Sequence, residues 1–227
     1  MKQIKIIGIG GVGTALLPFL CRYLNYKGEE CRVTLIDGDA FEHKNVKRQS
    51  FRTLGNKAKV KVSELIADYE NISFRSVSEF VTRENVDTLI AEEDIVIAGV
   101  DNHNTRKLLS DHCQTVDNIT LISGGNELTD GNVQVFLRRD GKNLTSPLTK
   151  YHQEIENPAD KNPGDLTCDE RARLPESHQI IVTNMGVAWL IFANYWLIEE
   201  GEFEKVGEHF FDIVEGKMQL VDRKETT

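Results

Sequence analysis

From residue 4 to about residue 140, short β-branched apolar runs alternate with longer segments whose apolar residues recur at helical spacing. Apolar runs bounded by turn residues are typical of strands, and a 3.6-residue period is typical of helices. The predicted strands span residues 4–9, 31–36, 71–77, 94–100, 120–123 and 133–138. The predicted helices span residues 13–25, 58–69, 83–91 and 104–113. This alternation predicts an α/β fold, with a Rossmann-like, doubly wound and mainly parallel sheet covered by helices on both faces.

The pattern changes after residue 141. Residues 142–179 hold four of the five prolines and few apolar residues, so we expect a crossover segment on the surface. Residues 180–199 are strongly apolar and predict a helix in the core or at a dimer interface. Residues 209–223 predict a C-terminal hairpin. We expect one domain at 1–141, the crossover segment at 142–179, and a helix and hairpin at 180–227 that complete the same domain.

Composition and charge narrow the class of function. The 227 residues carry 27 Lys and Arg against 36 Asp and Glu, a net charge of −9, which argues against a nucleic acid partner. The four cysteines form no C-x-x-C pair, so a paired-thiolate zinc site is not expected and the chain reads as cytoplasmic. No signal segment is apparent, and no apolar run reaches the ~20 residues that span a bilayer, so we expect no membrane partner.

A glycine-rich turn follows the first predicted strand. Gly8, Gly10 and Gly13 have the spacing G-x-G-x-x-G, with Gly11 as an additional glycine, and an apolar helix comes next. Such a turn lets the backbone approach a phosphate at a helix N-terminus, although it also occurs as a plain strand-to-helix connection. Asp37 ends the second strand, where a carboxylate can accept hydrogen bonds from ribose hydroxyls or act as a turn residue. Together these features favour a nucleotide site.

The loop after Asp37 carries more charge than a dinucleotide site needs. It holds a local basic cluster, formed by Lys44, Lys47, Arg48 and Arg52, and the amides of Asn45 and Gln49. Arg and Lys side chains suit the charged oxygens of a polyphosphate, while the alternative is a solvated charged loop.

Five motifs in this order resemble the ThiF/MoeB/HesA family of ubiquitin-activating-enzyme-like adenylyltransferases. They are the glycine turn, Asp37-x-Asp39, Asn45-x-x-Arg48-Gln49, Lys57-Ala58 and Asp101-Asn102-x-x-Thr105-Arg106. The resemblance covers residues 4 to about 140. It implies that residues 1–141 form an ATP-binding adenylation domain that uses ATP and Mg²⁺. The implied reaction activates the C-terminal carboxylate of a ubiquitin-like or sulfur-carrier protein ending in Gly-Gly, with release of pyrophosphate.

The resemblance also implies roles for single residues. Asp37 would hold the ribose, and Asn45, Arg48, Gln49 and Lys57 would contact the phosphates, with Lys59 as a second candidate for Lys57. Asp101 would lie beside Mg²⁺ and the reaction centre. The remaining expected nucleotide contacts are Gly8, Gly10, Gly11, Gly13, Asp39 and Asn102. Without the resemblance, Asp101 or Asn102 would read as the N-cap of the helix at 104–113.

Cys168 lies where relatives that form a thioester carry a cysteine, so it is either a covalent catalyst together with Arg48, Lys57 and Asp101, or an incidental thiol. Cys21, Cys31 and Cys113 read as structural. The resemblance favours a homodimer. Two departures from the family are the missing C-x-x-C zinc pairs and a first strand that starts close to Met1. We therefore expect the Arg that relatives supply to a partner's site from preceding helices to be missing or replaced.

Three other functions fit parts of the sequence. An NAD-dependent Rossmann oxidoreductase would use the same glycine turn, but it has no use for Asn45, Arg48 and Gln49. A non-catalytic or partner-dependent subunit of a heteromeric activating enzyme would lack the phosphate-contacting residues. An adenylyltransferase acting on a small molecule or a tRNA base is a further option, and the acidic net charge weighs against tRNA.

Overall fold

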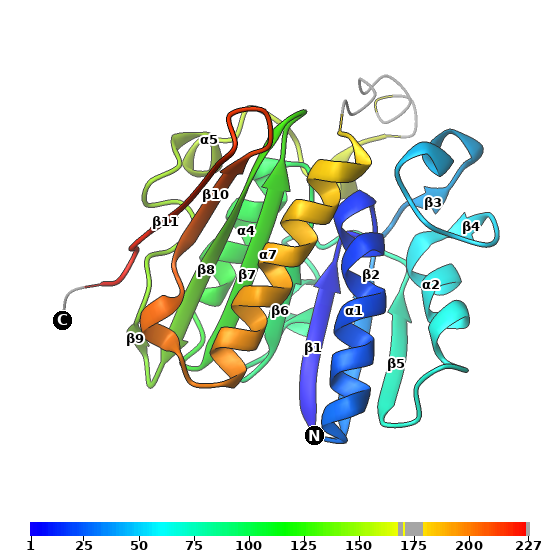
Figure 1. The fold of residues 1–227 in the computed structure, drawn as a ribbon, viewed down its shortest axis with the longest axis horizontal. Coiled ribbons are helices and arrows are strands. Elements are labelled where there is room, and N and C mark those ends of the chain that lie inside the picture. Colours follow the sequence, from blue (N-terminus) through cyan, green and yellow to red (C-terminus); the bar gives the residue numbers. More distant parts are fainter. Residues whose placement is uncertain (168–169, 171–178, 226–227) are drawn as a thin grey trace.

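A computed structural model describes residues 1–167, 170 and 179–225 (Figure 1). The first half of the chain forms β1 (Lys2–Ile7), α1 (Gly11–Lys27), β2 (Cys31–Ile36), β3 (Ala40–Phe41), the 3-10 helix η1 (His43–Lys47), β4 (Gly55–Asn56), α2 (Lys57–Leu65), β5 (Ile72–Val77), α3 (Val86–Leu89), β6 (Ile95–Ala98) and α4 (His103–Cys113). The second half forms β7 (Ile119–Asn126), β8 (Asp130–Arg139), β9 (Lys142–Asn143), α5 (Gln153–Glu156), the 3-10 helix η2 (Pro163–Asp165), α7 (Ile181–Glu199), the 3-10 helix η3 (Phe203–Lys205), β10 (Glu208–Asp212) and β11 (Lys217–Val221).

One large sheet organises the described residues, in the order β11-β10-β8-β7-β6-β1-β2-β5. The neighbours from β7 to β5 are parallel, with β1 beside both β2 and β6. The strands β8, β10 and β11 continue the sheet in antiparallel fashion, and β9 pairs with β8. The α/β class, the doubly wound order and the C-terminal hairpin predicted from the sequence are confirmed.

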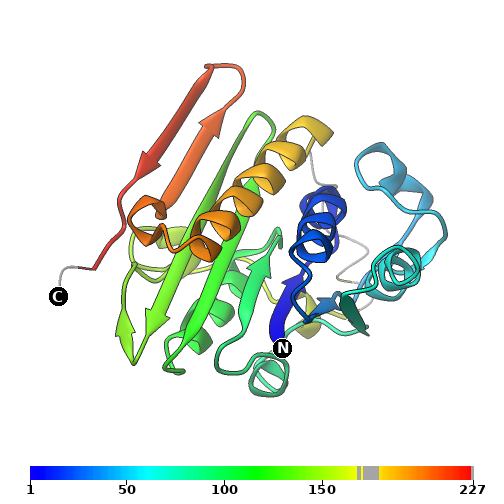
Figure 2. The same ribbon diagram turned by 60° about the horizontal axis from the view of Figure 1, so that its bottom comes forward.

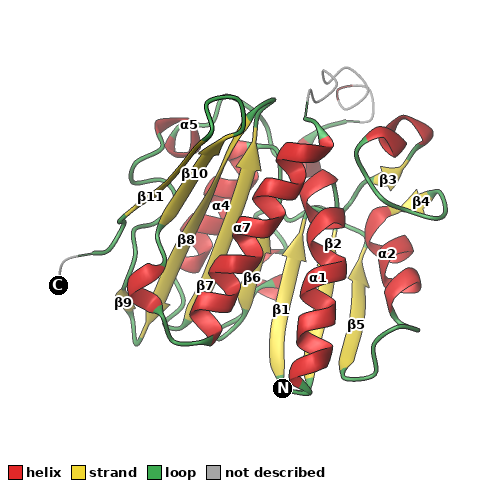
Figure 3. Ribbon diagram, viewed as in Figure 1, coloured by secondary structure: helices red, strands yellow, loops and turns green. Residues whose placement is uncertain are grey.

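Helices cover both faces of this sheet (Figures 2 and 3). On one face α1, α2 and α7 bury apolar side chains, among them Leu16, Leu20 and Ile191, against the sheet. On the other face α3, α4 and α5 pack over a second core that includes Phe136 and Leu109. Because strands of a parallel sheet are buried on both faces, β6 is apolar along its whole length rather than alternating.

The strand β7 is longer than the sequence pattern predicts. The pattern ends the strand at residue 123, but Gly124 and Gly125 both pair with β8 and belong to β7. They lie where neighbouring groups leave no room for a side chain. A Cβ at Gly124 would lie 2.5 Å from a Val187 methyl carbon, and one at Gly125 would lie 2.0 Å from the Arg106 guanidinium. These glycines therefore allow α7 and Arg106 to pack closely against the sheet, and they do not form a turn.

The crossover segment at 142–179 is anchored more firmly than its polar composition suggests. Leu148 and Ile155 belong to the second core, and Asn162 is only 3% exposed. The Asn162 amide donates a hydrogen bond to the Val81 carbonyl, at 2.9 Å. Within its described residues, the segment is therefore tied to the same face of the sheet as α4.

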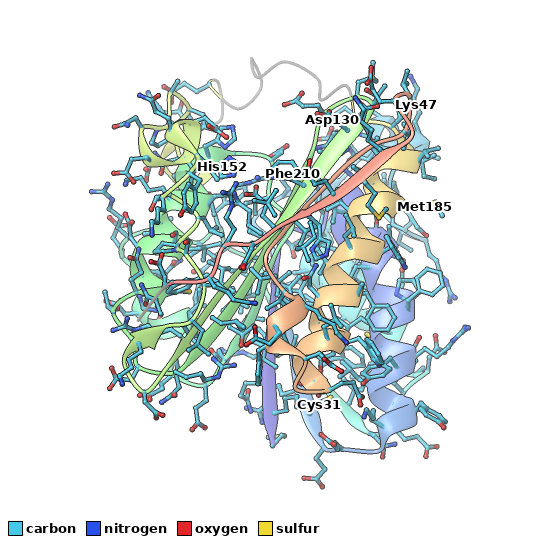
Figure 4. The ribbon with its side chains drawn as sticks, turned by 60° about the vertical axis from the view of Figure 1, so that its left-hand side comes forward. Cys31, Lys47, Asp130, His152, Met185 and Phe210 are labelled. Carbon is cyan, nitrogen blue, oxygen red and sulfur yellow. The ribbon has the colours of Figure 1, made fainter. Side chains whose placement is uncertain are left out.

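The helix α7 packs along β7, β8 and α1. An 18-residue stretch of this 19-residue helix has a mean hydropathy of 1.5, so by length and composition alone the helix could cross a membrane, but half of that stretch is buried inside the fold. Its outward side still exposes Met185, Trp189 and Trp196, and Figure 4 shows Met185 on the surface of this helix. A core helix with one apolar outward face explains these features.

Candidate nucleotide site

The glycine turn joins β1 to α1 at the carboxyl edge of the parallel strands. Gly8 has φ +87°, and a Cβ there would lie 2.8 Å from the Gly99 carbonyl oxygen. A Cβ at Gly13 would lie 2.3 Å from the Gly8 carbonyl oxygen. Both positions therefore require glycine. Gly10 is the N-cap of α1 and supplies no side-chain cap, so the first turn of the helix can offer its N–H groups to an anion.

Asp37 lies at the end of β2, beside this turn. Its carboxylate accepts hydrogen bonds from the Ile9 N–H at 2.6 Å and the Asp39 N–H at 2.8 Å. Burial raises the pKa of Asp37 above its usual range, and the Lys57 cation and the two N–H groups oppose that shift. Asp37, which is predicted to bind the ribose, therefore lies against the glycine turn, which is predicted to bind the phosphates.

Lys57 supplies a cation to the same edge. Its ammonium lies 3.2 Å from the Asp39 carboxylate, and its side chain is only 10% exposed. Asn56 caps α2, and its amide donates hydrogen bonds to the carbonyls of Asp37 and Asp39, which fixes the start of the helix there. Lys59, the other candidate, is exposed. The geometry therefore brings Lys57 rather than Lys59 to the acidic pair.

The loop at 43–50 lies against the first turn of α1. The Ser50 N–H donates to the Thr14 hydroxyl, at 3.5 Å, and the Gln49 amide nitrogen lies 3.8 Å from the Cβ position of Gly10. Gln49 is buried, and its Oε1 has no hydrogen-bond partner. Arg48 donates to Gln179, at 3.1 Å. Gln49 therefore borders the glycine turn, with Arg48 next to it in the chain.

Asn45 and Asn102 both make capping hydrogen bonds, in addition to the nucleotide contacts predicted for them. Asn45 Oδ1 accepts the Glu42 N–H at 2.8 Å and closes a capping box around η1, so a phosphate contact would have to come from its amide nitrogen. Asn102 is the N-cap of α4 and accepts the Thr105 N–H at 2.8 Å. The residue that caps α4 is therefore Asn102 and not Asp101, which is exposed, and the nucleotide contact predicted for Asn102 stays a prediction for its amide nitrogen.

Two residues to which sequence reasoning assigned no role hold the loop that carries Asp101. The buried Arg106 guanidinium donates to the carbonyls of Val100 and Gly124, and burial lowers its pKa. Asp160, from the crossover segment, accepts the N–H groups of His103 and Asn104 at the start of α4. Nothing in the spacing of Asp160 pointed to this helix, 56 residues earlier in the chain.

The predicted covalent nucleophile, Cys168, lies outside the described residues. Cys21, Cys31 and Cys113 are buried, as predicted for structural cysteines. Burial raises the pKa of the Cys21 and Cys113 thiols to about 12, so neither offers a thiolate at neutral pH.

The donor set fits ATP and Mg²⁺. The turn offers backbone N–H groups, the Gln49 amide nitrogen at its border can donate to a phosphate oxygen, and Lys57 supplies positive charge. The described residues contain no group of three or more potential metal ligands. Asp101 is an exposed carboxylate at this edge. Mg²⁺ is usually held by one or two carboxylates together with phosphate oxygens, so Asp101 would suit it as a ligand. When bound, such a cation would neutralise charge on the phosphates.

Comparison with known proteins places these features in a family. The model of the ThiF family matches residues 1–192. The SAMP-activating enzyme E1 of Haloferax volcanii is 27% identical over 127 residues, covering 54% of this chain and 45% of that protein. A probable molybdopterin-synthase adenylyltransferase of Porphyra purpurea is 25% identical over 174 residues, covering 74% of this chain and 42% of that protein.

Solved structures agree on the fold. The crystal structure of E. coli MccB with ATP superimposes with a TM-score of 0.73 at 18% identity, covering 99% of this chain and 64% of that chain. The crystal structure of PaaA gives a TM-score of 0.70 at 18% identity, covering all of this chain and 65% of that chain. The chain thus spans less than half the length of the curated relatives and under two thirds of these solved chains.

Proposed function

The chain belongs to the ThiF family, and from this premise we propose that it binds ATP with Mg²⁺ and adenylates a carboxyl terminus. The observation that carries the proposal is the arrangement at the carboxyl edge. There the buried Asp37 carboxylate, the glycine turn and the Lys57 cation are gathered, and Gln49 with its neighbour Arg48 borders the turn. A dehydrogenase would need the first two features only.

Each residue has a part in the proposed reaction. The first turn of α1 and Gln49 hold phosphate oxygens, and Asp37 orients the nucleoside through the ribose. Arg48 and Lys57 stabilise the negative charge that develops as the acceptor carboxylate attacks the α-phosphate and pyrophosphate leaves. In nucleotidyl transfer a protein acts mainly by positioning groups and neutralising this charge. Asp101 lies on the loop after β6, where such sheets place their ligands.

The acceptor that we propose is a small ubiquitin-like or sulfur-carrier protein with a Gly-Gly terminus. The names of two relatives support this class, since one is a SAMP-activating enzyme E1 and the other a probable molybdopterin-synthase adenylyltransferase. A peptide carboxylate is the second candidate, because one structure of the Microcin C7 biosynthetic enzyme MccB is a complex with N-formylated MccA. That fold matches with a TM-score of 0.74 at 17% identity.

The direct experiment incubates the chain with Mg²⁺, ATP labelled at the α-phosphate and a small protein ending in Gly-Gly. We expect label on the acceptor, or in AMP released from it, and none when the γ-phosphate carries the label. Binding of NAD without binding of ATP would favour the oxidoreductase instead.

We further propose that the chain is a cytoplasmic homodimer and that Cys168 receives the activated acyl group as a thioester. The apolar outward face of α7 supports the homodimer. An acceptor adduct that added thiols cleave, and that persists in Cys168→Ser, would remove Cys168 from this role.

A further inference from the structure

Buried polar atoms without partners gather at the carboxyl edge of the sheet. In the described part of the chain they include Gln49 Oε1, Ser123 Oγ, Asn126 Oδ1 and both polar atoms of the Asn184 side chain. A buried polar group without a hydrogen bond is destabilising, so such groups are rare unless a ligand or water completes them. Asn184 stands out because both its donor and its acceptor lack a partner.

Asn184 lies directly on the glycine turn. It belongs to the first turn of α7 and is 0% exposed. A Cβ added to Gly11 would lie 2.2 Å from Asn184 Nδ2 and 2.8 Å from Oδ1, so the amide covers the space that a side chain at Gly11 would occupy. Gly11 is the first residue of α1, whose free N–H groups form the proposed phosphate site.

The N-terminus of α7 lies beside the N-terminus of α1, close to the glycine turn. The helices α1 and α7 pack side by side, and both begin at the same edge of the sheet (Figures 1 and 3). Each helix N-terminus carries a partial positive charge, so an anion there would interact with both. Asn184 therefore lies between two helix ends that favour a phosphate.

A second buried asparagine on α7 shows that burial alone does not leave the amide nitrogen unpaired. Asn194 is also 0% exposed, but its Nδ2 donates to the Leu190 carbonyl at 2.8 Å and lies 3.2 Å from His209 Nδ1. It is ten residues away, about 15 Å along the helix. The unpaired nitrogen occurs at the residue that touches the glycine turn.

We propose that Asn184 is a nucleotide-binding residue, whose amide nitrogen donates a hydrogen bond to a phosphate oxygen of ATP held at the first turn of α1. This inference rests on the proposed function. It adds a contact from α7, a part of the chain outside the motifs at residues 4 to about 140. Together with Gln49, Asn184 would flank the phosphates with two carboxamides from separate elements.

The test measures binding of ATP and of adenosine by titration calorimetry to the wild-type chain and to Asn184→Leu, with Asn194→Leu as the matched control. Losing one hydrogen bond to a charged phosphate should raise the Kd for ATP about tenfold. Adenosine has no phosphate, so its Kd should not change. Asn194→Leu should bind both ligands like the wild type. The Tm of Asn184→Leu without ligand should not fall, since the variant removes two unpaired buried groups.

Asn184→Asp keeps the size of the side chain and covers the case in which the leucine variant does not fold. Its carboxyl group should repel phosphate once it ionises, so its Kd for ATP relative to the wild type should rise between pH 6 and pH 8.

Unchanged ATP binding in Asn184→Leu, or equal losses for ATP and adenosine, would overturn the inference while leaving the proposed function intact. Wild-type affinity of Asn184→Asp at pH 8 would do the same. A wild-type chain that binds no ATP would overturn both.

Discussion

At the scale of single residues, the side chains expected to bind the nucleotide already have hydrogen-bond or ion-pair partners within the protein. Asp37 already accepts two backbone N–H groups, and Lys57 is already paired with Asp39. The Asp39 side chain is half exposed, so Lys57 can turn to a phosphate at small cost in lost pairing. The edge is thus held in position by these contacts before a nucleotide arrives.

This arrangement predicts different outcomes for two lysines on the same helix. Replacing the buried Lys57 by Ala should raise the Kd for ATP about 10- to 100-fold, because a charged contact to phosphate is lost. Replacing the exposed Lys59 by Ala should leave the Kd unchanged. Titration calorimetry with ATP and Mg²⁺ measures both. Equal affinities in the two variants would refute the assignment of Lys57.

At the scale of elements, a buried ion cluster ties the crossover segment to the C-terminal hairpin. Glu208 on β10 is 1% exposed and lies 2.6 Å from His152 Nε2 and 2.8 Å from the Arg223 guanidinium. Figure 4 shows His152 on the crossover segment and Phe210 on β10. The hydrogen bond to Glu208 raises the pKa of His152 against the effect of burial, and Glu154 adds to the rise. Burial acts to raise the pKa of Glu208, but hydrogen bonds from His152, Asn132 and Arg223 leave it lowered.

The raised pKa of His152 predicts a pH dependence of stability. In an unfolded chain the pKa of His152 is about 6.5, so its contribution to the free energy of unfolding is complete below that pH and is lost as pH rises through the higher folded pKa. Urea unfolding should therefore show that the wild type loses more stability between pH 6 and pH 8.5 than His152→Gln. Other titrating groups are common to both proteins and cancel in the difference. Parallel profiles would show that this cluster does not titrate as described.

The sequence predicted elements better than it predicted contacts. Apolar periodicity located β2 at 31–36 without error, because a buried parallel strand has a distinctive composition. It ended β7 too early, because glycines that make room for α7 and Arg106 look the same in sequence as glycines that make a turn. The contacts of Asp160 and the role proposed for Asn184 depend on segments that are distant in the chain, which local patterns do not encode.

At the scale of the whole molecule, the outward face of α7 is the strongest sign of a second copy. Val182, Met185, Trp189 and Trp196 are each 46% or more exposed and lie three, four and seven residues apart, so they share one face of the helix. Exposed apolar stripes of this kind mark interaction surfaces more often than free surface.

The proposed homodimer can be tested on this face. Replacing Trp189 by Glu should convert the dimer to a monomer, because a charge in an apolar interface loses its hydration. Analytical ultracentrifugation measures the mass of the species in solution. Trp196→Glu, on the same face of the helix, should also shift the protein from dimer to monomer. A wild-type chain that sediments as a monomer would contradict the homodimer and leave the nucleotide site unaffected.

The central claim, ATP-dependent activation of a carboxyl terminus, is tested most directly by ATP–pyrophosphate exchange in the presence of a small protein ending in Gly-Gly. We predict exchange that depends on this acceptor, that falls at least about 100-fold in Arg48→Ala and that is retained in Arg52→Ala, with the Tm unchanged in both variants. Exchange at the wild-type rate in Arg48→Ala, or no exchange with any acceptor that offers a C-terminal carboxylate, would contradict the account.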